Sequence, residues 1–540
     1  MLGYHHGIIA RSEPRIISIV EKSPIRTYFD VTHAYWHGNV SMKWPMPNLW
    51  NFSKVRAVVF LLGFTLTFII MASYILTWDK KGLLLTPSPY YLKAANVSTN
   101  DTAAAALAFS VSLKTTCLDM KQLLKEIRFK LEYPPRSVPD EKDIIGTDSH
   151  LFSAIPRHFL PGIKSPCWYE DFPIEKSRDP YSGNRYTIRS KTFKSVCDRL
   201  AYAFRRQPLR RQDGRLSRLR CLPYFYIIGQ PKCGTTDLFH RLLQHPDIKF
   251  NIMKEPHWWT RKRFGYIRFK DGFQEIYSLE DYLDLFDLAA YNIQGSSAGN
   301  SPEDRRFANL ITGEASASTM WDNHAWRYLH GDQEEVEPPF LAQDFLHTVQ
   351  PNAKIIIMLR DPAERLYSDY LYFKTANKST EDFHQKVLES MQVFQSCLSA
   401  RSLRSCVYST SLANSMPVRL TLGMYIVFLL DWLTVFQREQ ILVLRLEDYA
   451  TNLQETVQKV FDFLNVGPLS EQAAATLTKG PMSNTRRAVD RSLGPMLPST
   501  QKLLWEFHQP FNRKLASVLN NQAFLWTNTS IPTSSNRHYG

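Results

Sequence analysis

A short turn rich in glycine, proline and lysine carries the clearest chemical signal in the chain. An apolar stretch, 224–228, leads directly into this turn, and a helical pattern begins at Asp237. Backbone N–H groups at the start of a helix, combined with one lysine ammonium group, form a site with the size and charge to hold a phosphate. Lys232 precedes the second glycine, Gly234, so the turn lacks the Gly-x-x-x-x-Gly-Lys-[Ser/Thr] pattern of ATP-binding loops. This order argues against a nucleotide kinase that uses ATP and magnesium.

Two motifs resemble the donor site of sulfotransferases that use 3′-phosphoadenosine 5′-phosphosulfate (PAPS). Gln230-Pro-Lys-Cys-Gly-Thr-Thr236 resembles the loop for the 5′-phosphosulfate, and the segment from Ile355 to Ser368 resembles the 3′-phosphate site. Residues 479–487 resemble, more loosely, a loop that closes over the nucleotide. The resemblance covers roughly residues 221–525 and implies a carbohydrate sulfotransferase with PAPS as co-substrate. The donor-binding residues that it implies are Gln230, Pro231, Lys232, Cys233, Gly234, Thr235, Thr236, Arg360, Ser368, Lys479, Arg486 and Arg487.

Sulfate transfer needs a cation beside the leaving phosphate. Negative charge grows on the bridging oxygen in the transition state, so a lysine held there stabilises that state more than the bound donor. We expect Lys232 to take this role; the alternative is an exposed turn lysine. Arg360 ends an apolar strand, where ligands of open α/β sheets collect, and its planar group suits a phosphate. It can instead pair with Asp361 or Glu364.

A sugar hydroxyl also needs a base to remove its proton as it attacks. The segment Lys254-Glu-Pro-His-Trp-Trp259 matches the pattern that carries the base in related heparan sulfate sulfotransferases, which implies Glu255 as the base. His257 is the competing candidate. We expect Trp258 and Trp259 to desolvate the Glu255 carboxylate and so to raise its pKa. The alternative is a structural ion pair with Lys254 or an arginine.

Two segments suggest how an acidic sugar chain is bound. The segments 254–259 and 313–318 look most like those of enzymes that sulfate carbon 6 of N-acetylgalactosamine 4-sulfate in chondroitin and dermatan sulfate. The cations at 261–263 directly follow the base and can grip carboxylates and sulfates. The predicted acceptor-binding residues are Trp258, Arg261, Lys262, Arg263, Glu314 and Ser316.

The whole chain is basic, with a formal net charge of +14 over 540 residues. Such a surface attracts polyanions, but the sequence has no nucleic-acid-binding motif, so a sulfated glycan is the expected partner and nucleic acid is not. Seven arginines between Arg205 and Arg220 form either a glycan-binding surface or a solvated charged face. A glycosaminoglycan-binding Golgi membrane protein that kept the fold without catalysis is the rival interpretation. The oligomeric state is open, a homo-oligomer included.

One segment, 57–78, has 22 consecutive uncharged and mostly apolar residues, enough to cross a bilayer as a helix. We therefore predict a single-pass type II Golgi membrane protein with a cytosolic tail (1–56), this anchor, a lumenal stem (79–150), an N-terminal extension (151–220) and a sulfotransferase domain (221–530). A helix at 118–131 is expected to interrupt the stem. Glycosylation sequons on the lumenal side begin at Asn96, Asn100, Asn377 and Asn528.

The expected fold is a P-loop-type three-layer α/β/α domain. Near-continuous apolar strands suit a mainly parallel sheet with helices on both faces. The expected strands are 224–228, 248–252, 310–313, 354–359 and 440–446, and the expected helices are 237–245, 362–374, 380–395, 418–436 and 452–464.

Cysteine spacing supports one disulfide, and the spacing of other ligand types supports no metal. Cys397 and Cys406 are close enough in sequence to close a loop in an oxidising compartment. The pairing of Cys117, Cys167, Cys197 and Cys221 is left open. Cys233 is interpreted as a small residue that shapes the turn. Without zinc or calcium spacing, we expect chemistry that requires no metal.

Overall fold

The computed structural model of the chain describes ten segments. They are residues 118–172, 179–206, 209–210, 214–249, 253–266, 275–294, 309–325, 337–374, 376–483 and 485–527. The predicted anchor and the sequons at Asn96, Asn100 and Asn528 lie outside these segments, whereas Asn377 is described and exposed. No helix within the described segments is long and apolar enough to cross a membrane.

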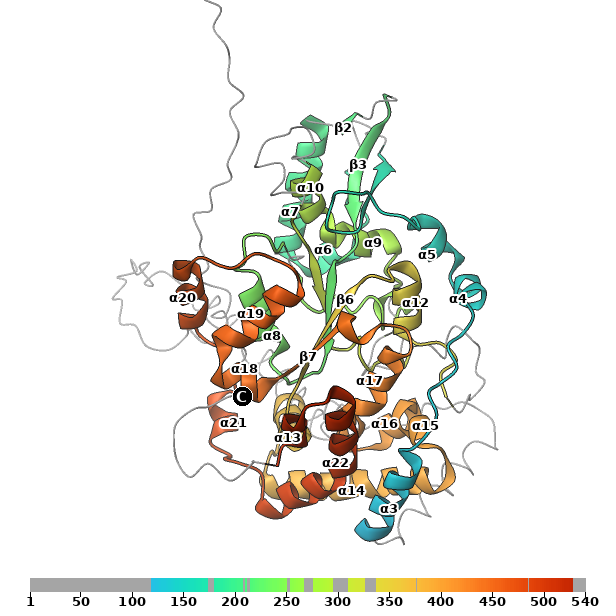
Figure 1. Ribbon diagram of the computed structural model, residues 1–540, viewed down its shortest axis with the longest axis vertical. Helices are drawn as coiled ribbons and strands as arrows, with labels where there is room; N and C mark the ends of the chain where they lie inside the picture. The colour runs from blue at the N-terminus through green and yellow to red at the C-terminus, as the bar shows by residue number, and fades with distance from the viewer. Residues whose placement is uncertain are drawn as a thin grey trace, which may run out of the picture. The chain divides into compact units, whose positions relative to one another are not determined.

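A four-stranded parallel sheet positions the loops that carry the predicted motifs (Figure 1). Its order is β5-β4-β6-β7, and every neighbouring pair is parallel. The predicted strands 224–228, 354–359 and 440–446 form within one residue of their expected ends, whereas the strand predicted at 310–313 overlaps β5 only at Gly313. At 248–252, the described residues form one isolated bridge, from Ile248 to Ile311. The strands are β4 (Phe225–Gly229), β5 (Gly313–Ala315), β6 (Lys354–Leu359) and β7 (Ile441–Arg445).

Helices cover both faces of this sheet, as a three-layer fold requires. Along β6, Ile355 and Ile357 pack in one hydrophobic cluster, whereas Ile356 and Met358 pack in another on the opposite face. The first face meets α12 (Ala342–Val349), α13 (Pro362–Phe373), α17 (Tyr425–Leu433) and α22 (Pro498–Leu519). The second meets α8 (Thr235–Leu242), α18 (Leu446–Thr451), α19 (Leu453–Phe463) and α20 (Glu471–Lys479).

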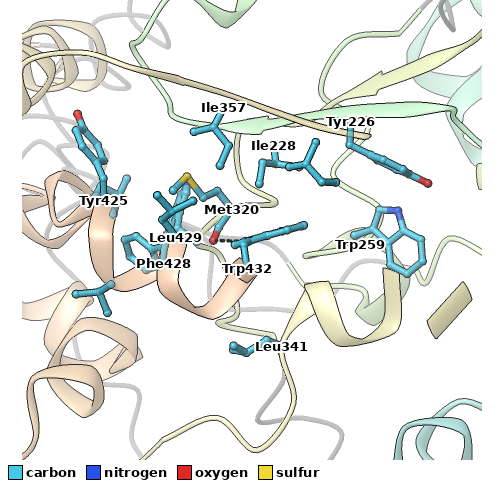
Figure 2. Packing of buried hydrophobic residues seen from close by; sticks show 14 of the residues in the cluster. Tyr226, Ile228, Trp259, Met320, Leu341, Ile357, Tyr425, Phe428, Leu429 and Trp432 are labelled. Atoms are coloured by element: carbon cyan, nitrogen blue, oxygen red, sulfur yellow. Dashed lines mark hydrogen bonds between the residues drawn. The ribbon is translucent and has the colours of Figure 1, made fainter. Parts of the chain in front are cut away.

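The first cluster also fixes the segment that follows β5. Figure 2 shows Ile228 and Ile357 of the sheet beside Met320 and Trp432. The Trp432 indole N–H donates to the Met320 carbonyl oxygen at 3.2 Å, and all four side chains are buried. This packing holds residues 313–321 rigidly against α17, so polar groups on that segment have fixed positions.

The helix predicted over 418–436 is broken in two. A 3-10 turn, η4 (Leu420–Gly423), precedes α17, and Met424 between them has non-helical backbone angles. A Cβ at Gly423 would lie 2.7 Å from the His508 ring, so close packing against α22 requires glycine there. The other predicted helices form within a few residues of the expected ends, apart from α14 (Thr380–Ala400), which runs further.

The predicted N-terminal extension is an ordered layer around a small antiparallel sheet, β1-β3-β2. A disulfide joins Cys167 of β1 (Cys167–Asp171) to Cys221 of β3 (Leu216–Cys221), a pairing that the sequence left open. In the arginine cluster, Arg218 and Arg220 are buried and paired with acids, so these two do not bind a glycan. The remaining elements here are α6 (Arg185–Arg189), α7 (Lys191–Arg206), β2 (Leu209–Arg210), α9 (Leu279–Leu283), η2 (Asp284–Phe286) and α10 (Asp287–Gln294).

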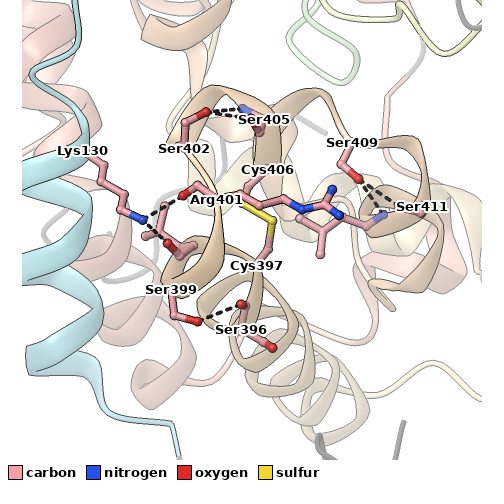
Figure 3. Close-up of a disulfide and its surroundings, with 12 residues drawn as sticks. Lys130, Ser396, Cys397, Ser399, Arg401, Ser402, Ser405, Cys406, Ser409 and Ser411 are labelled. Carbon is pink, nitrogen blue, oxygen red and sulfur yellow. Dashed lines mark hydrogen bonds between the residues drawn. A yellow bond between two sulfur atoms is a disulfide. The ribbon is translucent and has the colours of Figure 1, made fainter. Parts of the chain in front are cut away.

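The last part of the predicted stem is instead part of the folded core. Leu123 and Ile127 of α3 (Met120–Lys130) are 0% exposed, and this helix packs against α14 and α22. Figure 3 shows Lys130 reaching the turn after α14, where its ammonium group donates to the Arg401 carbonyl oxygen at 2.8 Å. Beside it, the predicted disulfide joins Cys397 to Cys406 of α15 (Leu403–Tyr408). Residues 120–130, which the sequence assigned to the stem, therefore pack with α14 and α22. The other short elements are α4 (Glu141–Thr147), α5 (Ser149–Ala154), η1 (Lys262–Phe264), α16 (Thr410–Ser415), η5 (Arg438–Gln440), α21 (Ala488–Arg491) and η6 (Gln522–Leu525).

Candidate active site

A cavity of about 380 Å³ lies at the carboxyl ends of β4 and β5. This is the edge of an open parallel sheet where ligands bind. Its walls bring together residues of the 230–236 loop, of the segment 254–259 and of segments that are distant in the sequence, whereas no residue of 355–368 lines it. The predicted residues that line it are Pro231, Lys232, Gly234, Thr235, Thr236, Glu255, His257 and Arg261; Lys254, Ser318, Trp321, Tyr372 and Arg419 are among the additional ones.

The turn after β4 has the geometry of an anion-binding loop. Gly234 has a φ of 85°, and a Cβ there would lie 2.6 Å from Leu446, so only glycine fits. Because α8 begins at Thr235, the N–H groups of Thr235 and Thr236 have no partner within the helix. Both residues line the cavity. Gln230 uses its own N–H in a bond to the Met358 carbonyl oxygen, and Cys233 is fully buried. Burial raises the pKa of the Cys233 thiol to about 12, which suits a packing role.

Lys232 points its ammonium group along the cavity wall. Its Nζ lies 3.9 Å from the centre of the Tyr372 ring. Burial lowers the pKa of Lys232 to about 8; Asp369 opposes the shift, while the positive charges of Arg360 and Arg419 add to it. The lysine is therefore not an exposed turn residue, and it still carries a charge at neutral pH.

This lowered pKa predicts an alkaline limit to activity. The ammonium form is the active one, so we expect kcat/KM, which reports ionisations of the free enzyme, to fall as the pH rises above about 8. An arginine keeps its charge at far higher pH, so Lys232→Arg is expected to move that fall upward even if its rate is lower. A pH–rate profile measures both. A wild-type profile with no alkaline fall would contradict the role of the Lys232 charge.

Glu255 is ionised and partly exposed to the cavity. Its side chain is 30% exposed and forms an ion pair with Lys254, and its Oε2 accepts the Ala317 N–H at 2.9 Å. Burial raises the pKa of Glu255, but the charges of Lys254 and His257 and these hydrogen bonds outweigh it, so the pKa lies below its ordinary value. The expected rise is thus wrong, because these interactions outweigh the desolvation of the carboxylate.

His257 is held by a chain of hydroxyl groups. Its Nδ1 lies 2.7 Å from Ser318 Oγ, which lies 2.9 Å from Thr260 Oγ1, while its Nε2 faces Glu255 Oε2 at 3.5 Å. Burial, chiefly, lowers the pKa of His257 to about 4, so the imidazole is neutral at pH 7. A carboxylate repels a nitrogen lone pair, so this arrangement favours a proton on Nε2, with Ser318 donating to Nδ1.

We expect Ser318→Ala to loosen this arrangement. The loss of one hydrogen bond should lower turnover by about two- to tenfold. Because His257 lowers the pKa of Glu255, a misaligned imidazole should also move the acid limb of the pH–rate profile upward. Thr260→Ser, which keeps its hydroxyl, is the matched control and should retain the wild-type profile. An unshifted acid limb in Ser318→Ala would show that the hydroxyl chain does not position His257.

Two arginines outside the cavity wall carry unpaired donors suited to a second anion. Arg360 is buried and pairs through Nη2 with Glu364 at 3.2 Å, as one alternative predicted, yet its Nη1 has no partner. Nε of Arg486 is likewise buried without a partner, and the charge of Arg360 contributes to a lowered pKa of Arg486, after burial. Ser368 is buried on α13, the helix that also carries Glu364. These orphaned donors fit a phosphate group.

Two basic residues of the segment 479–487, Arg487 and Lys479, do not line the cavity. Arg487 pairs with Asp490 at 2.7 Å and donates to the Leu371 carbonyl oxygen at 3.0 Å. Lys479 is exposed at the end of α20. Ser483, which the sequence did not single out, is the residue of this segment that lines the cavity, and its N–H donates to Asp237 of α8 at 2.7 Å.

Several predicted acceptor contacts lie behind the cavity instead of on its wall. The Trp258 indole donates to the Tyr277 carbonyl oxygen in the core, and Arg263 is buried in an ion pair with Asp148 at 2.5 Å. Neither can reach a sugar in the cavity, because apolar packing surrounds both. Arg261 does line the cavity, held by Asp322 at 2.5 Å.

Glu314 and Ser316 are buried behind the loop that carries Glu255 and His257. Glu314 is 2% exposed and one of its oxygens has no partner. Burial raises the pKa of Glu314 to about 8, against the effect of a hydrogen bond with Ser316 and with added repulsion from Glu255. Ser316 Oγ accepts the His257 backbone N–H at 3.0 Å. Ser316 therefore holds the backbone of His257, and Glu314 is hydrogen-bonded to Ser316; sugar contact by these two residues stays a prediction.

The sequence did not reveal the pair formed by Arg419 and Asp369. Arg419 lines the cavity, and its Nε donates to Asp369 of α13 at 2.7 Å. Both groups influence the pKa of Lys232. The residues are fifty positions apart and belong to no shared motif, so only the fold brings them together.

Comparison with known proteins defines the class of this site. Residues 223–488 match the family model described as the sulfotransferase domain, and the chain belongs to this family of PAPS-using enzymes. In particular, it is 50% identical over 490 residues to carbohydrate sulfotransferase 15 of Homo sapiens, covering 89% of this chain and 87% of that protein. Among solved structures, a sulfotransferase from Alicyclobacillus acidocaldarius is similar with a TM-score of 0.36 and 21% identity, over 56% of this chain and 99% of that one.

Proposed function

We propose that this protein transfers sulfate from PAPS to carbon 6 of N-acetylgalactosamine 4-sulfate in chondroitin or dermatan sulfate. The proposal is supported by the 50% identity to carbohydrate sulfotransferase 15 and by the resemblance of segments 254–259 and 313–318. We further propose a Golgi membrane location, with an anchor at 57–78 and the described domain in the lumen.

One observation carries the catalytic part of the proposal. Lys232, Glu255 and His257 line one cavity, and their φ angles are 67°, 61° and 54°. The other non-glycine residues with positive φ in the described segments are three asparagines, which tolerate it, and Trp526. Such backbone strain costs roughly 1–3 kcal/mol per residue and concentrates at functional sites. The fold thus maintains three strained residues where a donor and an acceptor would meet.

Each residue has a defined task in the proposed reaction. The ammonium group of Lys232 and the N–H groups of Thr235 and Thr236 hold the 5′-phosphate end, and Arg360 with Arg486 holds the 3′-phosphate. Lys232 stabilises charge on the oxygen between phosphorus and sulfur as its bond to sulfur breaks.

On the acceptor side, Glu255 takes the proton of the sugar hydroxyl while that oxygen forms its bond to sulfur. The products are 3′,5′-adenosine bisphosphate and the sulfated sugar. No residue in this scheme requires a metal ion.

The decisive assay uses purified full-length protein, labelled PAPS and a panel of unsulfated and 4-sulfated chondroitins. Disaccharide analysis of the product should show 4,6-disulfated units from the 4-sulfated acceptor. Label on another position would correct the acceptor assignment. No incorporation into any acceptor, by protein that still binds chondroitin sulfate, would favour the non-catalytic glycosaminoglycan-binding alternative.

A further inference from the structure

A basic surface lies beside the cavity, where the N-terminal extension meets the loop of Glu255. It consists of Arg189 at the end of α6 and Lys262 at the start of η1, both placed against the ring of Tyr277. Arg189 lies outside the stretch 223–488 that matches the sulfotransferase family model. This surface is therefore an addition that the extension makes to the shared domain.

The extension is fixed directly to the catalytic loop at this point. The Tyr186 hydroxyl of α6 donates to the Pro256 carbonyl oxygen at 3.1 Å, between Glu255 and His257 in the chain. The rings of Tyr186 and Tyr277 are 4.7 Å apart, and the Tyr277 N–H donates to the Lys262 carbonyl oxygen at 3.0 Å. Arg189 follows Tyr186 by less than one helical turn, so it is held close to the cavity rim.

Positive charge accumulates on this surface. The Arg189 guanidinium carbon lies 5.9 Å and Lys262 Nζ lies 4.9 Å from the centre of the Tyr277 ring. Burial lowers the pKa of Lys262 to about 8, and the charges of Arg189 and Arg261 add to this effect. Like charges held together in this way cost free energy that an anion between them would recover.

Three acids described in this region lie close to other arginines. Glu275 forms an ion pair with Arg185, and Asp281 lies 4.0 Å from the same arginine. Asp322 holds Arg261. Basic side chains thus follow one another from Arg261 on the cavity wall to Lys262 and Arg189.

We propose that Arg189 and Lys262 form a second acceptor subsite, which binds a carboxylate or sulfate on a sugar next to the one in the cavity. This inference rests on the proposed function, because it assigns the neighbouring units of the same acidic polysaccharide. An acceptor chain carries anionic groups at regular intervals. A second cationic subsite therefore raises the affinity for an acceptor that is long enough to reach it. Arg189 is exposed, and the exposed side chains of Ile188 and Ile276 flank the subsite.

The test compares Arg189→Gln with Arg513→Gln in the full-length protein. Both residues are exposed arginines, and Arg513 lies on α22, so the two variants change the net charge equally. Chondroitin 4-sulfate polymer and its shortest accepted oligosaccharide serve as acceptors. We expect Arg189→Gln to raise the KM for the polymer by about two- to fivefold relative to the control and to reduce the preference for the polymer. A double variant with Lys262→Gln should raise it further.

A binding measurement separates this inference from the proposed reaction. On immobilised chondroitin 4-sulfate, Arg189→Gln should elute at lower salt than Arg513→Gln, whether or not sulfate is transferred. Equal elution and equal KM ratios in the two variants would overturn the subsite. An equal loss with long and short acceptors would overturn it too, because a neighbouring subsite must depend on chain length. Absence of sulfate transfer by the wild type, with the elution difference intact, would count against the reaction alone.

Discussion

Glu255→Gln should lower the turnover of sulfate transfer by about 10²- to 10⁴-fold, the usual contribution of a general base. The amide keeps the shape of the side chain and can still accept the Ala317 N–H, so the loop should retain its conformation. It cannot take the proton of a sugar hydroxyl. Single-turnover rates with labelled PAPS measure the loss, and calorimetry with 3′,5′-adenosine bisphosphate should show unchanged nucleotide binding.

The matched variant for this experiment is His257→Asn. The His257 imidazole is neutral and its Nδ1 is hydrogen-bonded to Ser318, so its loss should cost less than the loss of Glu255. If Glu255→Gln were fully active while His257→Asn was inactive, the base role would pass to His257.

Lys232→Ala should lower turnover by about 10²- to 10³-fold, the typical cost of removing one group that stabilises developing charge. The ammonium group packs on the half-exposed Tyr372 ring, and it takes part in no ion pair within the described segments. We therefore expect the thermal unfolding midpoint to stay within the range of the wild type. Kinetics at saturating PAPS measure the effect on transfer apart from donor binding.

Lys502→Ala provides the control, because Lys502 is an exposed lysine on α22. It should retain wild-type turnover. A Lys232→Ala protein with an unchanged rate would remove this lysine from the mechanism, and an unfolded one would show instead that the lysine is needed for the turn.

Local patterns were enough to predict the parts of the site that are continuous in the chain. The strand 354–359 has the predicted ends, because a run of five apolar residues between two helices is typical of a buried strand. The turn after Gly229 follows from glycine placement and the apolar strand before it, and the helix predicted at 237–245 forms two residues earlier, at Thr235. In each case the residues that decide the structure are neighbours in sequence.

Features that depend on contacts between distant segments could not be predicted from the sequence. Arg419 reaches the cavity only because η4 and α13 pack together. The lowered pKa of Glu255 depends on the positions of Lys254, His257 and the Ala317 N–H around its carboxylate, which the sequence pattern does not specify. The helix α3 reads as an isolated amphipathic segment, and only its partners α14 and α22 show that it belongs to the core.

The most direct test of the account is a crystal structure of the protein with 3′,5′-adenosine bisphosphate and a 4-sulfated chondroitin oligosaccharide. We predict the 5′-phosphate beside Lys232 and the N–H groups of Thr235 and Thr236, the 3′-phosphate at Arg360, and a sugar 6-hydroxyl within hydrogen-bond distance of Glu255. A nucleotide bound elsewhere, or a sugar hydroxyl out of reach of Glu255, would contradict the central claim that one cavity joins the cationic donor site to the acceptor's base.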